Sequence, residues 1–139
     1  MTTRVSTSSL WPVLRYDNAA AAIEWITTVA GFEAGLVLAD AAGNVEHAEL
    51  WYGNGVVVVM SRAEFRPDKP VLTSGPGMIE VTVPDVRAHH AHAVSLGAEV
   101  VQPVLDGVAG LSFVLRDAEG NLWVFGTYRP GSFVAPEAA

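Results

Sequence analysis

The sequence contains no cysteine among its 139 residues. Disulfide bonds, thiolate metal sites and cysteine nucleophiles are therefore excluded. Long apolar runs are also missing, since none approaches the roughly 20 residues that a membrane-spanning helix needs. The first residues lack the apolar core of a secretory signal. We therefore expect a cytoplasmic protein without a membrane partner.

Basic residues are scarce, because 8 Lys and Arg residues are outnumbered by 15 Asp and Glu residues. The resulting formal net charge of −7 argues against a nucleic-acid partner, which would need a basic stripe to bind phosphates. The acidic balance is compatible with a cationic small-molecule ligand. Half of the residues are hydrophobic and 17% are charged, which is ordinary for a globular protein.

The chain reads as two similar halves. Each half begins with a short apolar strand and a polar turn that contains Asn18 or Asp85, continues with an Ala-rich helix and reaches a glycine, Gly31 or Gly97. Asn and Asp are favoured helix N-caps, and glycine after the last turn is a common helix stop. Three strand-like runs follow each helix, separated by turn signals. The pattern predicts a βαβββ plan that occurs twice.

We therefore predict an α+β fold in a single domain, 1–139, built from paired βαβββ modules whose curved mixed sheets surround a cavity. Module one is expected at about 10–61 and module two at about 78–128. The stretch of about 62–77, which is rich in Pro and Gly, is predicted to link them, and about 129–139 to form a tail. Each helix should cover one face of its sheet and leave the other face for a ligand.

The segment VEHAELWY, Val45–Tyr52, places a histidine and a carboxylate two residues apart. In a strand, His47, Glu49 and Trp51 share one face, and the Ala, Leu and Tyr residues between them share the other. A helix-covered face favours Ala and Leu, so the polar set should face the cavity. Two protein ligands do not hold a metal tightly by themselves. We favour a polar pair that hydrogen-bonds internally or to a ligand over an acid/base pair.

Aromatic and thioether side chains are expected at the same cavity. Trp11 and Trp51 should face it, with Met78 nearby. Such side chains form flat, polarizable walls for planar or cationic ligands, although they can also simply fill a core.

Three further polar residues, Arg15, Glu80 and Thr82, should point inward by the same alternation. Arg15 could pair with Glu80 or Glu49, because a buried charge needs a partner. It could instead hold a ligand carboxylate or carbonyl. The internal pairing is the favoured interpretation.

The second predicted helix carries three histidines, His89, His90 and His92. His89 and His92 are three residues apart and could share one helix face. We expect that face to be exposed to solvent on the outer side of the sheet, and a native metal site there is not favoured.

Four segments carry a resemblance to a known family: LRYDNAAAAIEWITTVAGFE, HAELWYG, VTVPDVRAHHAHAVSLGAEVV and RDAEGNLWVFGTY. They resemble the vicinal oxygen chelate superfamily of glyoxalase I, extradiol dioxygenases, fosfomycin resistance proteins and bleomycin resistance proteins. The resemblance covers roughly residues 10 to 128. Ala118 stands where the family usually has proline. The resemblance implies the paired-module fold and, for metal-using members, four metal-ligand positions.

The resemblance implies one ligand position on the first strand and one on the last strand of each module. Counting along the internal repeat places these positions at Trp11, Val58, Met78 and Val124. None of these side chains is a usable ligand for a hard or borderline divalent ion. A register shift of one residue recovers no ligand set. We therefore expect no metal and no other cofactor.

The favoured hypothesis is a metal-independent binding protein of the bleomycin resistance type, which would sequester an aromatic or cationic natural product and so provide antibiotic resistance. The expected ligand-binding residues are Trp11, Arg15, His47, Glu49, Trp51, Val58, Met78, Glu80, Thr82 and Val124. The resemblance also implies a homodimer, which light scattering would distinguish from a monomer.

The alternative is a metal-independent lyase, isomerase or cyclase. In that case His47 or Glu49 would transfer a proton at the carbon next to a carbonyl group, and Arg15 would stabilise the resulting oxyanion. A metalloenzyme of the glyoxalase or dioxygenase type is less favoured.

Overall fold

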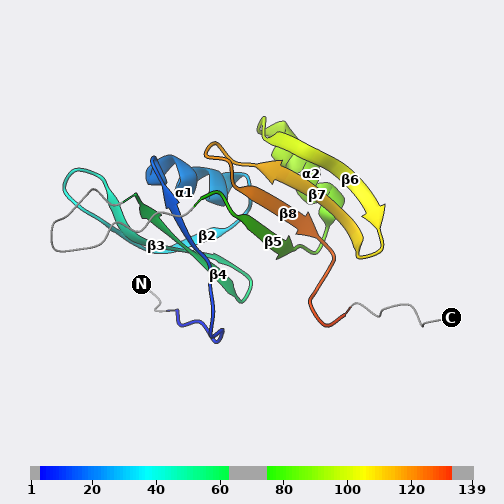
Figure 1. The fold of residues 1–139 in the computed structure, drawn as a ribbon, viewed down its shortest axis with the longest axis horizontal. Helices are drawn as coiled ribbons and strands as arrows, with labels where there is room; N and C mark the ends of the chain where they lie inside the picture. Colours follow the sequence, from blue (N-terminus) through cyan, green and yellow to red (C-terminus); the bar gives the residue numbers. More distant parts are fainter. Residues whose placement is uncertain (1–3, 63–74, 133–139) are drawn as a thin grey trace. The chain divides into compact units, whose positions relative to one another are not determined.

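A computed structural model describes residues 4–62 and 75–132 of the chain. The chain divides into two compact units, 1–75 and 76–139. In its described residues, each unit contains one helix and a four-stranded mixed sheet (Figure 1). This arrangement confirms the predicted α+β fold with paired βαβββ modules. Most of the predicted linker and most of the predicted tail lie outside the described residues.

The first unit follows the predicted order of elements. Its elements are β1 (Val13–Tyr16), α1 (Ala19–Thr28), β2 (Glu33–Ala39), β3 (Val45–Tyr52) and β4 (Gly55–Ser61). The strands lie in the spatial order β1-β4-β3-β2. Strand β1 runs parallel to β4, while β2, β3 and β4 are antiparallel neighbours.

The second unit repeats this topology. Its elements are β5 (Met78–Thr82), α2 (Val86–Ser95), β6 (Glu99–Gly107), β7 (Gly110–Arg116) and β8 (Leu122–Gly126). The strand order is β5-β8-β7-β6, with β5 parallel to β8. None of the helices in the described ranges is long and apolar enough to cross a membrane.

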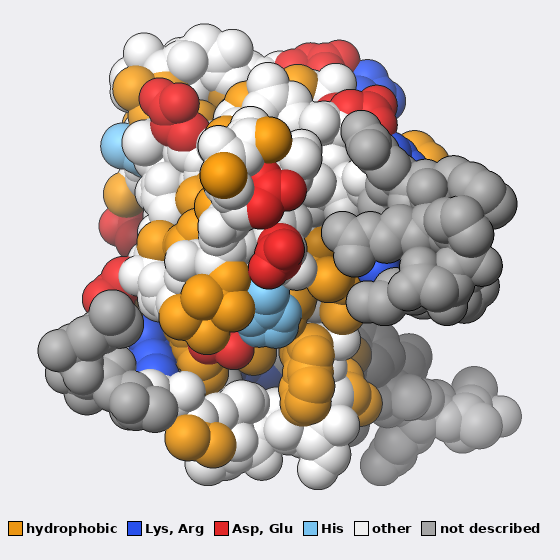
Figure 2. All heavy atoms as spheres, turned by 90° about the vertical axis from the view of Figure 1, so that its left-hand side faces the viewer, with side chains coloured by type: hydrophobic (Ala, Val, Ile, Leu, Met, Phe, Trp, Pro, Cys, Tyr) orange, Lys and Arg blue, Asp and Glu red, His pale blue; other side chains and the backbone are white. Residues whose placement is uncertain are grey.

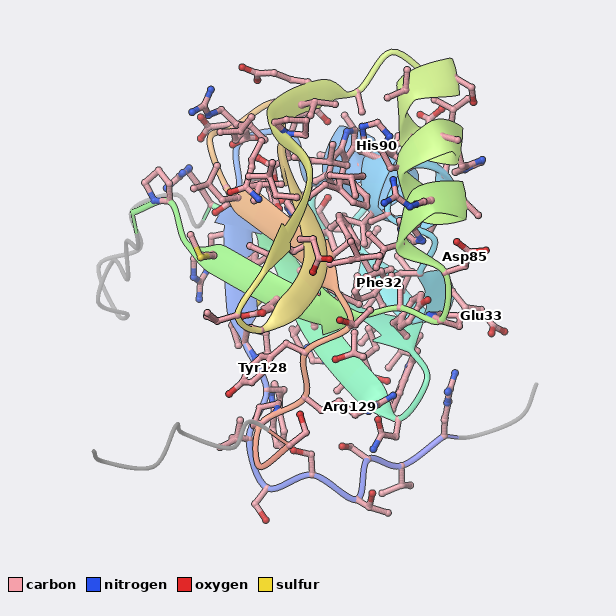
Figure 3. The ribbon with its side chains drawn as sticks, turned by 90° about the vertical axis from the view of Figure 1, so that its right-hand side faces the viewer. Phe32, Glu33, Asp85, His90, Tyr128 and Arg129 are labelled. Carbon is pink, nitrogen blue, oxygen red and sulfur yellow. The ribbon has the colours of Figure 1, made fainter. Side chains whose placement is uncertain are left out.

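Both helices begin where their capping residues predict. The Asn18 side chain accepts a hydrogen bond from the Ala21 amide at 3.1 Å, and the Asp85 side chain accepts one from Ala88 at 3.0 Å. Each bond satisfies an amide that has no partner inside the first helical turn. Figure 3 shows Asp85 where the chain enters α2. The helices thus start directly after β1 and β5 and turn back over one face of each sheet.

The core of each unit lies between its helix and its sheet. In the first unit, the buried side chains on this side alternate along the strands, as the half-buried pattern requires. They are Leu14, Tyr16, Ala48, Leu50, Val57 and Val59, with Ile26 from α1. In the second unit, the largest buried side chains are Phe113, Leu115, Trp123 and Phe125. The opposite face of each sheet is left for other contacts.

The prediction that His89 and His92 share a solvent-exposed face of α2 is wrong. The His89 ring stacks on Phe125 with centroids 4.6 Å apart, and His90 meets Phe113 edge-on at 5.1 Å. Figure 3 shows His90 on the side of α2 that faces the strands. The helix is short of large apolar residues, so imidazole rings supply the surface that packs on the buried Phe pair. Only His92 of the three is exposed.

A buried carboxylate organises the turn between β7 and β8. Asp117 is 5% exposed and accepts hydrogen bonds from the backbone amides of Glu119 and Asn121, each at 3.0 Å. Its second oxygen accepts from the Trp123 indole at 3.1 Å and from the Asn121 side chain at 3.2 Å. The Asn121 side-chain oxygen then accepts from the Gly77 amide at 2.8 Å. This network ties the turn to the residue before β5.

Replacing Asp117 by Asn should lower the free energy of unfolding by about 1–3 kcal/mol, because an amide NH2 would face donors that need acceptors. Chemical denaturation would measure the loss. The matched control is Asp106→Asn, which makes the same substitution on exposed β6 and should change stability by less than about 0.5 kcal/mol. Equal effects of the two substitutions would contradict the role assigned to Asp117.

Candidate functional site

The open side of the first unit contains a pocket of about 250 Å³. Strands β3 and β4 form its floor, and the segment before β1 forms a wall. Its lining residues are Arg4, Val5, Ser6, Trp11, His47, Glu49, Trp51, Val56 and Val58. The structure therefore brings together five of the predicted site residues: Trp11, His47, Glu49, Trp51 and Val58.

The alternation along β3 separates the pocket from the core. Ala48 and Leu50 are fully buried under α1, whereas His47 and Glu49 line the pocket. Tyr52 lies on the helix side, where its ring packs against Phe32 with centroids 5.3 Å apart. Burial raises the pKa of the Tyr52 phenol above its ordinary value of 10.0. The two faces of one strand thus provide an apolar core and a mixed polar and aromatic lining.

The polar part of the pocket is a histidine–carboxylate pair. His47 Nε2 and Glu49 Oε2 are 3.2 Å apart, and their side chains are 36% and 29% exposed. Figure 2 shows one face of the molecule, on which acidic side chains lie beside hydrophobic ones. Because solvent reaches both side chains, a ligand in the pocket can reach them too. The pair can accept a hydrogen bond, attract a cation or exchange a proton.

The aromatic part of the pocket comes from two indoles with different surroundings. Trp11 precedes β1 and is 49% exposed, whereas Trp51 is only 5% exposed. A methyl group built at Gly35 of β2 would lie 2.8 Å from Trp51 Nε1 and 3.1 Å from its Cδ1. The indole therefore approaches the backbone of β2 closely at Gly35, where only glycine leaves room for it. Gly35 was not identified from the sequence, because its role depends on which strand lies beside β3.

The segment before β1 supplies a residue that sequence reasoning missed. The Arg4 guanidinium carbon lies 4.4 Å from the centroid of the Trp51 ring, and Arg4 Nη2 donates a hydrogen bond to the Gly53 carbonyl at 2.7 Å. No periodic pattern in the sequence indicates this contact, because it joins residues almost fifty positions apart.

Arg15 is not among the residues that line the pocket. It lies on β1 opposite Met60 of β4 and is half-buried. Among the described residues of the first unit, no ion pair joins it to Glu49. Glu49 lies 3.2 Å from His47 instead, and the role of Arg15 stays a prediction.

The remaining predicted residues belong to the sheet of the second unit. Glu80 of β5 lies opposite Val124 of β8, and Met78 is 62% exposed at the start of β5. The Thr82 hydroxyl donates a hydrogen bond to the Tyr128 carbonyl in the segment after β8. Thr82 is thus held by a structural contact within its own unit.

Comparison with known proteins fits this architecture. A family described as "Glyoxalase-like domain" matches residues 17–125. The chain belongs to this glyoxalase-like family. No match was found among curated proteins.

Several solved structures have the same fold. TioX from Micromonospora sp. ML1 is 31% identical with a TM-score of 0.70, over 87% of this chain and 100% of that chain. Lactoylglutathione lyase from Agrobacterium tumefaciens is 19% identical with a TM-score of 0.65, over 88% and 95% of the two chains. UcmS2 is 17% identical with a TM-score of 0.64, over 91% and 99%. The last two similarities show the fold alone.

The glyoxalase-like fold raises the question of a metal ion. The positions that the family resemblance marks for ligands hold Trp11, Val58, Met78 and Val124. In the part of the chain that the structure describes, no group of three or more His, Cys, Asp or Glu side chains could hold a metal ion. Indole, isopropyl and thioether groups do not match the oxygen and nitrogen ligands that such ions prefer. The residues present therefore do not fit a divalent metal at these positions.

Replacing Gly35 by Ala should displace the Trp51 indole, because the added methyl group would overlap its Nε1. We expect a red shift of tryptophan emission and a loss of about 1–3 kcal/mol in stability. The control, Gly55→Ala, adds a methyl group whose nearest neighbour is 3.5 Å away, so it should leave the emission unchanged. The shift should disappear in a Trp51→Phe background, and its persistence there would show that another tryptophan responds.

Proposed function

We propose that this glyoxalase-like protein binds a small aromatic or cationic molecule without a metal ion, in the manner of the bleomycin resistance type. The observation that carries the proposal is the pocket of the first unit, where two indoles and a histidine–carboxylate pair meet. Sequestration of such a compound would make the protein a resistance factor in the cytoplasm.

The chemistry of the lining supports a planar ligand. Indole faces attract planar rings by stacking and cations by their negative π surface. Val56 and Val58 of β4 add apolar side chains to the lining. Glu49 and the net charge of −7 favour a cation over an anion.

The size of the pocket supports a ring system as the bound part of the ligand. Its volume of about 250 Å³ is below the range of about 300–1,000 Å³ that is typical for drug-sized ligands. A larger natural product would therefore place one planar group in this pocket and extend beyond it.

Titration with proflavine, a planar aromatic cation, should show saturable binding by calorimetry, and neutral 2-naphthol should bind more weakly. Trp11→Ala should lower the proflavine affinity about 3- to 10-fold, because it removes one stacking wall. Trp25→Phe, which changes a tryptophan on α1 outside the pocket, should leave the affinity unchanged. The proposal fails if neither probe binds, or if Trp11→Ala and Trp25→Phe behave alike.

A second candidate function is metal-independent proton transfer. The supporting observation is that His47 and Glu49 contact each other at 3.2 Å on the wall of the pocket. A carbonyl compound held beside the indoles would then place an acidic C–H near the pair. A paired imidazole and carboxylate can remove and return such a proton, as a lyase or isomerase requires.

Deuterium exchange next to the carbonyl of phenylacetone, followed by NMR, would detect that activity. The enzyme hypothesis expects exchange faster than in buffer, and a loss of about 100-fold in His47→Gln or Glu49→Gln. The control is His92→Gln, which removes an exposed imidazole of α2. The enzyme hypothesis is contradicted if the exchange rate equals that in buffer, or if neither His47→Gln nor Glu49→Gln lowers it. Binding would then remain as the proposed function.

A further inference from the structure

Arg4, at the wall of the pocket, covers the Trp51 ring as a bound planar cation would. Its guanidinium lies over the Trp51 ring at 4.4 Å, and its Nη2 donates to the Gly53 carbonyl at 2.7 Å. Gly53 belongs to the turn between β3 and β4, so the acceptor lies two residues beyond the indole along the chain. One cationic group thus uses a π face and a carbonyl oxygen at the same time.

We propose that Trp51 and the Gly53 carbonyl form a subsite for an amidinium or guanidinium group of the ligand, and that Arg4 fills this subsite until the ligand displaces it. The inference rests on the proposed binding function and names the chemical class of the group that enters. A planar cation with N–H donors at its edge satisfies both contacts at once, because its face stacks while its edge donates. A tetrahedral ammonium offers no such flat face.

Arg4 is held loosely enough to be displaced. Arg4 forms no ion pair with any described residue, and it is exposed to solvent. A cation–π contact of an exposed side chain is weak, and the Gly53 carbonyl can accept from water when Arg4 leaves. Release of Arg4 therefore breaks no salt bridge.

The neighbouring residues favour a cation over a neutral group. Glu49 lines the same pocket, and the whole chain carries a net charge of −7. Trp51 itself is fixed, because it is 5% exposed and lies against Gly35. Because the ring is already fixed, it loses little conformational entropy when a ligand stacks on it.

The test compares p-aminobenzamidine with its neutral analogue p-aminobenzamide on the full chain. In Arg4→Ala, the affinity for p-aminobenzamidine should rise about two- to five-fold, because the internal competitor is gone. The affinity for p-aminobenzamide should change by less than about two-fold. The control is Arg62→Ala, which removes the same charge from an exposed ion pair with Asp17 and should change neither affinity. Circular dichroism would verify that both variants are folded.

Three results would overturn the inference: equal p-aminobenzamidine affinity in the wild type and Arg4→Ala, weaker binding in Arg4→Ala, or an equal gain for the neutral amide. Equal affinity would show that Arg4 does not compete with the ligand. Weaker binding would show that Arg4 assists binding as part of the wall. An equal gain for the amide would show that removing Arg4 opens space without any preference for a cation. If proflavine binds while p-aminobenzamidine fails, the proposed function stands and the subsite does not. Failure of proflavine to bind would instead count against the proposed function.

Discussion

The pocket depends on the two-residue alternation of strand β3. Because successive side chains of a strand point to opposite faces, one eight-residue segment builds both the core and the candidate site. Ala48 and Leu50 are buried under α1, and that burial fixes the register of β3 against its neighbours. His47, Glu49 and Trp51 then have to face the other way. A slip of one residue would exchange the two sets, so the packing of the core is what holds the polar pair in the pocket.

The two units use one topology for different chemistry. In each unit a helix capped by Asn or Asp covers a sheet in which the first strand runs parallel to the last. Under α2, the rings of His89 and His90 pack on two buried phenylalanines, whereas α1 uses Ile26 and alanines. On the open side, the first unit presents indoles with a histidine–carboxylate pair, while the second presents Met78 and Glu80. A repeated backbone therefore leaves the side chains on each open face free to diverge.

The prediction from sequence was accurate wherever local rules decide the outcome. Asn18 and Asp85 accept hydrogen bonds from helix amides three residues later, so the type of the capping residue was enough to locate both helix starts. Strand β3 has the predicted bounds for a similar reason, because its alternation and its flanking turns are both local. Strand β6 continues to Gly107, beyond its last apolar residue Leu105, because backbone pairing of Gly107 with Gly110 needs no apolar side chain. The solvent face predicted for His89 was wrong because spacing along a helix does not reveal which ring the neighbouring sheet offers.

By itself, the sequence determined the βαβββ repeat, the residues that share each strand face, and which side chains stand at the positions that the family resemblance marks for metal ligands. These properties follow from periodicity, capping and the identity of single residues, which need no knowledge of distant neighbours. Only the tertiary structure decided that Gly35 makes room for Trp51 and that Arg4 lies on the indole. Each of these depends on which strand or segment lies beside another. Such proximity is set by the packing of the whole unit, in which many weak contacts act together.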